Sequence, residues 1–137
     1  MKVMLDTNII LDVLLDRLPF SIEAVEIFSA IEALQFQGFI SATTVTTIFY
    51  LASKTLGRAS AKRALKKLLQ LFEVAPINQS ILQRAIETSF ADFEDAVLYQ
   101  AALQAGASSI VTRNPKDFKQ ASLPIYTPTE FLRSFAS

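Results

Sequence analysis

Apolar runs and segments with helical periodicity alternate along this chain. The apolar runs predict short strands at residues 2–5, 39–41, 73–77, 109–112 and 124–126. Between them, apolar positions recur at helical spacing and predict helices at about 7–16, 21–37, 44–56, 58–72, 78–90, 92–106 and after 127. Strands that alternate with helices are typical of βαβ units, so we expect the α/β class, with a mostly parallel sheet covered on both faces.

Residues that cap or break helices support these boundaries. Gly38 is expected to end the second helix, and Asn78 is a plausible N-cap for the helix that follows the third strand. Pro76 indicates that this third strand is short or lies at an edge of the sheet. Thr127-Pro128-Thr129-Glu130 has the pattern of a capping box with proline at the first helical position, which predicts a C-terminal helix.

Composition favours one globular domain and excludes much chemistry. The 137 residues are 51% hydrophobic and include eleven phenylalanines, so we expect a single domain spanning 1–137. No apolar run is long enough to span a membrane, no signal-peptide pattern is present, and the lack of cysteine fits a cytoplasmic protein. Without histidine or cysteine there is no Ser-His-Asp triad, no cysteine nucleophile and no ordinary zinc site. Oxygen-ligated Mg²⁺ or Mn²⁺ remains open.

The net charge is zero, but basic residues are concentrated in one segment. No acid occurs between Glu32 and Glu73, and nearly half of the basic residues lie in that window: Lys54, Arg58, Lys62, Arg63, Lys66 and Lys67. One interpretation is the solvated face of an amphipathic helix. The other is a surface that contacts the phosphates of a nucleic acid, through Arg58, Lys62, Lys66 and Lys67, or that docks an acidic partner.

Asp6 follows the first predicted strand directly, and Asn8 lies in the next helical turn. One interpretation is that Asp6 or Thr7 only caps that helix. We favour a functional Asp6, because ligands bind at the carboxyl ends of the strands in open α/β sheets.

A second acidic cluster, Asp92-Phe93-Glu94-Asp95, opens the predicted helix at 92–106. We expect Asp92 to act mainly as a cap, because an acid at this place is stabilised by the helix dipole. Asp95 lies one turn inside a helix rich in alanine, where close packing on the sheet would bring it towards Asp6. Glu94 is expected to point elsewhere, since successive helical residues do not share a face.

Thr112, Arg113 and Asn114 follow the fourth predicted strand, so they occupy the same edge as Asp6. Thr112 either belongs to the site or satisfies backbone groups of the Asn114-Pro115 turn. For Asn114 we favour a functional role, and Asp117 either reaches the rim of the site or caps a short turn.

Carboxylates held close together repel one another, and a divalent cation relieves that repulsion. A bound Mg²⁺ ion activates water as a nucleophile and stabilises charge at a reacting phosphorus. Hydrolysis of a phosphodiester bond therefore suits a site without histidine.

Three segments resemble the PIN-domain nuclease family, in particular the small VapC-like toxin ribonucleases of prokaryotic toxin–antitoxin pairs. They match in order and spacing over nearly the whole chain: Leu5-Asp6-Thr7-Asn8-Ile9-Ile10-Leu11-Asp12, Asp92-Phe93-Glu94-Asp95-Ala96 and Val111-Thr112-Arg113-Asn114-Pro115-Lys116-Asp117-Phe118. The resemblance implies a three-layer α/β/α sandwich of four to five strands and RNA cleavage with Mg²⁺ or Mn²⁺. It also implies a homodimer and, in toxin systems, inhibition by an antitoxin.

For the site, the resemblance implies Asp6, Asp95 and Asn114 as catalytic residues and Asp6 and Asp95 as metal ligands. Asn8, Asp92, Thr112 and Asp117 would support them. The chain departs from the family at two positions, because Thr47 stands where a glutamate is expected and Asn114 where aspartate is common. Both replacements remove negative charge and so weaken metal binding.

Two hypotheses of different kinds follow. The first is a metal-dependent endoribonuclease. The alternative is a catalytically weakened module of the same fold, which binds RNA or a protein partner, through the basic residues 58–67, without efficient cleavage. A phosphate-binding P-loop is excluded, because the chain has three glycines and no Gly-rich GK[ST] stretch.

Overall fold

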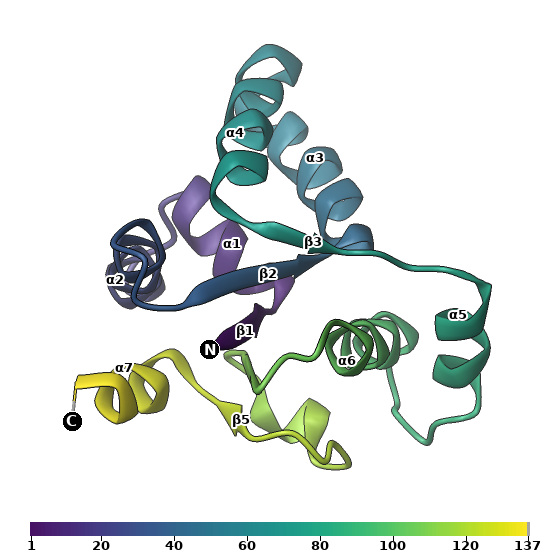
Figure 1. Ribbon diagram of the computed structural model, residues 1–137. Helices are drawn as coiled ribbons and strands as arrows, with labels where there is room; N and C mark the ends of the chain where they lie inside the picture. The colour runs from purple at the N-terminus through teal and green to yellow at the C-terminus, as the bar shows by residue number, and fades with distance from the viewer. Residues whose placement is uncertain (137) are drawn as a thin grey trace.

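Strands and helices alternate along the backbone of the computed structural model, which describes residues 1–136 (Figure 1). Residue 137, the last of the expected 1–137 domain, lies outside the described residues. The first half contains β1 (Lys2–Leu5), α1 (Thr7–Leu14), α2 (Phe20–Glu32), β2 (Gln37–Ser41), α3 (Ala42–Leu56) and α4 (Arg58–Leu71). The second half contains β3 (Glu73–Ala75), α5 (Gln79–Ile86), α6 (Phe93–Ala105), β4 (Ser109–Val111), the 3₁₀ helix η1 (Pro115–Phe118), β5 (Ile125–Tyr126) and α7 (Pro128–Ala136).

The strands form one five-stranded sheet in the order β3-β2-β1-β4-β5, and every neighbouring pair is parallel. β1 is central, with Met4 opposite Phe39 of β2 and Ile110 of β4. The carboxyl ends of β1 and β4 therefore meet at one edge, where Asp6 donates its backbone N–H to the Val111 carbonyl at 3.0 Å. The parallel sheet of the predicted α/β class is confirmed.

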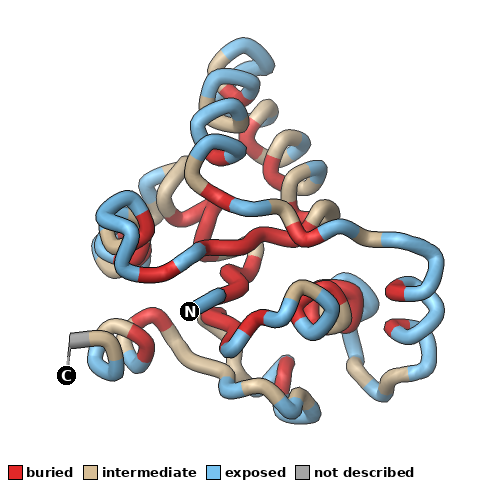
Figure 2. Tube along the Cα trace, in the orientation of Figure 1, coloured by how far each residue is buried: buried red, intermediate tan, exposed pale blue. Residues whose placement is uncertain are grey.

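Alternate residues of the strands pack into two separate hydrophobic cores, one on each face of the sheet. Val3 and Leu5 of β1 pack with α1, α2 and α7 in one core, whereas Met4 packs with α6 and η1 in the other. Buried positions accordingly follow the strands and the inner sides of the helices (Figure 2). Helices thus cover both faces of the sheet, which confirms the expected three-layer sandwich.

Two predicted helix ends are wrong. The second helix ends at Glu32 instead of Gln37, because Leu34 adopts a left-handed φ of 60° and turns the chain towards β2. The fifth helix ends at Ile86 instead of about residue 90, although Asn78 caps it as expected by accepting the Ile81 N–H at 3.0 Å.

Gly38 lies inside β2. The prediction that it ends the second helix is therefore wrong. A Cβ at this position would lie 2.6 Å from Ile31 Cδ1 and 2.8 Å from Phe72 Cε1. The absence of a side chain lets α2 and the end of α4 approach the sheet closely.

Candidate active site

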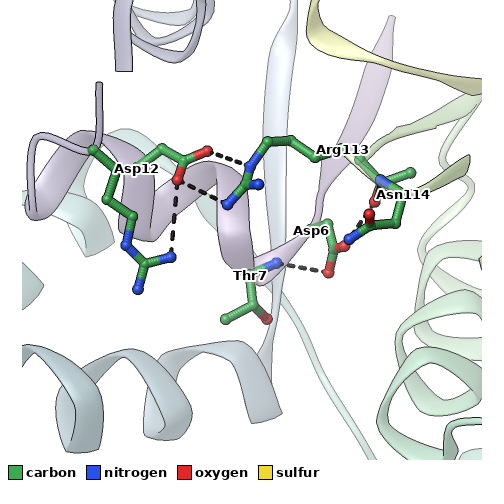
Figure 3. A network of polar contacts seen from close by, with 7 residues as sticks. Asp6, Thr7, Asp12, Arg113 and Asn114 are labelled. Carbon is green, nitrogen blue, oxygen red and sulfur yellow. Dashed lines mark hydrogen bonds and ion pairs between the residues drawn. The ribbon is translucent and has the colours of Figure 1, made fainter. Parts of the chain in front are cut away.

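Asp6 joins β1 to α1 and is both a helix cap and a residue of the sheet edge. Its Oδ1 accepts the Thr7 N–H at 2.8 Å (Figure 3). Its Oδ2 accepts the Thr112 hydroxyl at 2.8 Å. The residue is only 8% exposed. Burial raises the pKa of Asp6 and the bonds from Thr112 and Thr7 oppose that rise, so the carboxyl is held firmly in a position that disfavours its charge.

Asp95 lies in the first turn of α6, and its backbone N–H is capped by Asp92 Oδ1 at 3.0 Å. The predicted capping role of Asp92 is confirmed by this bond. Burial, followed by the charges of Asp6, Asp92, Asp117 and Glu94, raises the pKa of Asp95 to about 7. Among residues 1–136, no lysine or arginine forms an ion pair with Asp95. The Asp95 carboxyl is therefore surrounded by negative charges of other acidic side chains.

Glu94 differs from the expectation that it points away. Its Oε1 accepts a hydrogen bond of 3.4 Å from the Thr47 hydroxyl of α3. Burial and the charge of Asp92 raise the pKa of Glu94, with a smaller contribution from Asp6. The side chain thus belongs to the same acidic region as Asp6 and Asp95. Helical periodicity could not predict this contact, because it joins two helices that are distant in the sequence.

Thr112 is fully buried and links the ends of two strands. Its hydroxyl donates to Asp6 and accepts the Asn114 N–H at 3.1 Å, so the predicted role of satisfying a backbone group of the turn is confirmed. Asn114 is half-buried beside it. Asp117 lies exposed on η1, and its charge acts on both Asp6 and Asp95. Asn8 is half-buried in the first turn of α1.

A buried ion pair, which the sequence interpretation missed, flanks these residues. Arg113 binds both oxygens of Asp12, Nε at 2.8 Å and Nη2 at 3.1 Å, and its guanidinium lies 4.0 Å from the centroid of the Phe20 ring. Asp12 is completely buried, and Arg17 approaches it to 3.9 Å (Figure 3). The Asp12 carboxylate in the first motif is therefore committed to Arg113.

The basic residues lie elsewhere. Arg58, Lys62, Lys66 and Lys67 are exposed on α4, which packs beside α3 (Figure 1). Lys67 also lines a groove of about 710 Å³ between α1, α2 and α4, to which neither Asp6, Glu94 nor Asp95 contributes. None of the helices within residues 1–136 has the length and apolar character that crossing a bilayer requires.

The donor chemistry of the acidic region fits a hard divalent cation. The chain supplies only oxygen ligands there, and the carboxylates that surround Asp95 are not neutralised by an ion pair within residues 1–136. As they stand, however, no three acidic side chains of the described residues lie close enough together to hold a metal ion. The region therefore has negative charge that would attract a cation, but its carboxylates do not form a complete ligand set.

Comparison with known proteins agrees with this fold. The PIN domain family model matches residues 2–116. The chain is 28% identical over 138 residues to ribonuclease VapC1 of Aquifex aeolicus, and this similarity covers 95% of this chain and 92% of that protein.

Solved structures show the same likeness. A toxin–antitoxin complex from Klebsiella pneumoniae contains a chain that is 28% identical, with a TM-score of 0.68 over 92% of this chain and 97% of that one. VapBC2 from Rickettsia felis, bound to a DNA fragment from its promoter, is 19% identical with a TM-score of 0.71, over 93% of this chain and 98% of that one. The fold, the order of the motifs and the match to the family model together place the chain in the PIN domain family.

Proposed function

We propose that the protein is an endoribonuclease that hydrolyses RNA phosphodiester bonds with Mg²⁺ or Mn²⁺, and that it is the toxin of a toxin–antitoxin pair. The observation that carries this proposal is the accumulation of unneutralised carboxylates around Asp95 at the carboxyl edge of a parallel sheet. The similarity to ribonuclease VapC1 and to chains of toxin–antitoxin complexes supports the substrate and the partner.

In this proposal each residue has a physical task. Asp6 and Asp95 hold the cation, and Thr112 keeps the Asp6 carboxylate in one orientation through its 2.8 Å bond. Asn114 and Asn8 orient the substrate or water, while Asp92 fixes the start of α6 and Asp117 adds negative charge. When bound, the cation supplies an activated water and neutralises charge at the phosphorus.

The proposal also covers the assembly and location of the protein. We expect an antitoxin to inhibit it, and we expect a homodimer in the cytoplasm. These expectations rest on the family resemblance, and that of an antitoxin also on the similar chain from a toxin–antitoxin complex.

Asp6→Asn tests the catalytic proposal. Asparagine keeps the oxygen that caps α1 but removes the charge, so Mg²⁺-stimulated RNA cleavage should fall roughly 100-fold or more while the fold is retained. Cleavage of a labelled RNA and circular dichroism would measure the two properties. Asp16→Asn, at an exposed position after α1, is the matched control and should cleave normally.

Unchanged cleavage by Asp6→Asn would contradict the proposal. The alternative, a weakened module that only binds RNA or protein, has support from the uncharged Thr47 and Asn114 and from the lack of three converged acids within residues 1–136. Titration calorimetry with Mn²⁺ separates the two hypotheses, because the binding module predicts no metal binding at millimolar concentrations.

A further inference from the structure

A pocket of about 390 Å³ lies where the start of α2, the loop after β4 and the start of α7 meet. Its walls are formed by Phe20, Glu23, Arg113, Asn114 and residues 127–129. Asn114 connects the pocket to the candidate active site, because its N–H donates to the Thr112 hydroxyl at 3.1 Å and that hydroxyl donates to Asp6 at 2.8 Å. A ligand in the pocket would therefore lie next to the proposed catalytic edge.

The two charged side chains of the pocket are each held by a partner and retain unused hydrogen-bonding groups. Glu23 Oε1 accepts the Thr129 hydroxyl at 2.7 Å, whereas Oε2 forms no hydrogen bond within residues 1–136. Arg113 binds Asp12 through Nε and Nη2, and its Nη1 donates to no other residue of the same range (Figure 3). The pocket thus offers a fixed carboxylate acceptor and a fixed guanidinium donor.

The charges and the aromatic wall of the pocket suit a base better than a phosphate. The positive charge of Arg113 is balanced by Asp12, and Glu23 adds a negative charge, so an anion gains little here. Phe20 is 46% exposed, and the Arg113 guanidinium lies 4.0 Å from its ring centroid. Unpaired bases of RNA stack on aromatic rings and on arginine planes of this kind.

We propose that this pocket binds a guanine base of the RNA, in a nucleotide next to the bond that is cut. Guanine carries two adjacent donors, N1–H and N2–H, which match the two oxygens of the Glu23 carboxylate, and its O6 accepts a hydrogen bond from Arg113. No other base of RNA has two adjacent donors on its Watson–Crick edge. This inference rests on the proposed ribonuclease function, and it adds a preference for sequence to it.

The test measures the affinity of the full chain for short RNAs by fluorescence anisotropy, with EDTA present so that no cleavage occurs. The RNAs are uridine oligomers with one central guanosine, inosine or adenosine; inosine lacks only the N2 amino group of guanosine. We expect the guanosine RNA to bind about tenfold more tightly than the other two. Equal affinity for the three RNAs overturns the inference.

Glu23→Gln should reduce this preference to about twofold or less, because the amide cannot accept two hydrogen bonds from guanine as the carboxylate does. The amide oxygen still accepts the Thr129 hydroxyl, so the contact between α2 and α7 is preserved. Glu26→Gln, at an exposed glutamate of the same helix outside the pocket, is the matched control and should keep the full preference. An unchanged preference in folded Glu23→Gln overturns the inference, since a merely structural Glu23 would not select a base.

Two further measurements separate stacking from base selection and RNA from a free nucleotide. Phe20→Leu should weaken the binding of all three RNAs by about tenfold and leave their ratios unchanged. Guanosine monophosphate should displace the guanosine RNA only at much higher concentration than unlabelled guanosine RNA does. If it competes equally well, the occupant is a free nucleotide and the inference is overturned.

The outcomes for this inference and for the proposed function differ. If the protein cleaves RNA with Mg²⁺ but shows no preference for guanosine, the ribonuclease stands and the guanine pocket does not. If it prefers guanosine but never cleaves RNA, the pocket stands and the ribonuclease does not. If it binds none of the RNAs, the inference is overturned.

Discussion

Asp6 performs two tasks with one side chain, and this affects how variants at the position are interpreted. One carboxylate oxygen caps α1 through Thr7, and the other is oriented by Thr112. Alanine at this position would remove the cap, which costs about 1 kcal/mol, together with the charge. Asparagine separates the two effects, because it retains the capping oxygen.

Asp95 gives a pH dependence whose sign follows from its environment. Its pKa in the folded protein is raised from 3.8 to about 7, so between these values the folded state holds a proton that the unfolded state has lost. The contribution of Asp95 to the free energy of unfolding therefore falls as the pH rises through this window.

Asp95→Asn removes this titration. In metal-free protein it should raise the melting temperature by a few degrees at pH 8 and leave it nearly unchanged at pH 4, which thermal unfolding at the two values would measure. Its cap bond is preserved, because that bond uses the backbone N–H. A lower melting temperature at pH 8 would contradict the repulsion that we infer around Asp95.

Between elements, the Arg113–Asp12 pair connects the loop after β4 to the middle of α1. Both bonds are short, 2.8 and 3.1 Å, and Asp12 has no exposure to solvent. Arg113 is also stacked on Phe20 at the start of α2. One arginine thus holds three elements together beside the residues Thr112 and Asn114.

Arg113→Met should lower the free energy of unfolding by about 3–5 kcal/mol, because it leaves the buried Asp12 charge without its main partner. Urea denaturation would measure this loss. Arg17→Met is the matched control and should cost much less, since Arg17 stays 3.9 Å from Asp12. Equal losses of unfolding free energy in the two variants would show that the hydrogen bonds from Arg113 are not the main stabilisation of the buried Asp12 charge.

The sequence predicted most of the helices and strands but misplaced the ends of some helices. The order of strands and helices follows from hydrophobic periodicity, and the Thr127–Glu130 capping box is present as expected, with bonds of 2.8 and 3.1 Å. Gly38 was wrongly predicted to end a helix, because glycine is needed there for a tertiary contact. Phe72 occupies the space above β2 that a side chain at this position would fill. Local sequence signals cannot report contacts with residues so far along the chain.

For the whole molecule, the parallel topology explains why Asp6, Asn114 and Asp95 could be associated from the sequence alone. The carboxyl ends of β1 and β4 lie side by side, and α6 packs over that region of the sheet. Glu94 could not be predicted in the same way, because its contact with Thr47 depends on how α3 and α6 are placed relative to each other. The sequence specifies the elements, whereas this meeting of two helices depends on their packing.

The exposed basic side chains of α4 allow a test of the RNA surface. Replacing Lys62, Lys66 and Lys67 together with glutamine should reduce the slope of log affinity against log salt by up to about 2, if all three contact phosphates of a single strand. RNA binding measured over a range of salt concentrations gives the slope. Arg84→Gln with Arg133→Gln is a control at exposed cations outside α4. An unaltered slope would leave the solvated surface or an acidic partner as the role of the helix.

The turn between α2 and β2 also has a practical consequence. Leu34 at its tip is 89% exposed, and the turn leads into the amino end of β2, on the edge of the sheet away from Asp6. The chain contains no cysteine, so Gln35→Cys would introduce a unique thiol at an exposed position of this turn. A fluorophore or spin label attached there would report tumbling and partner capture without obstructing the acids.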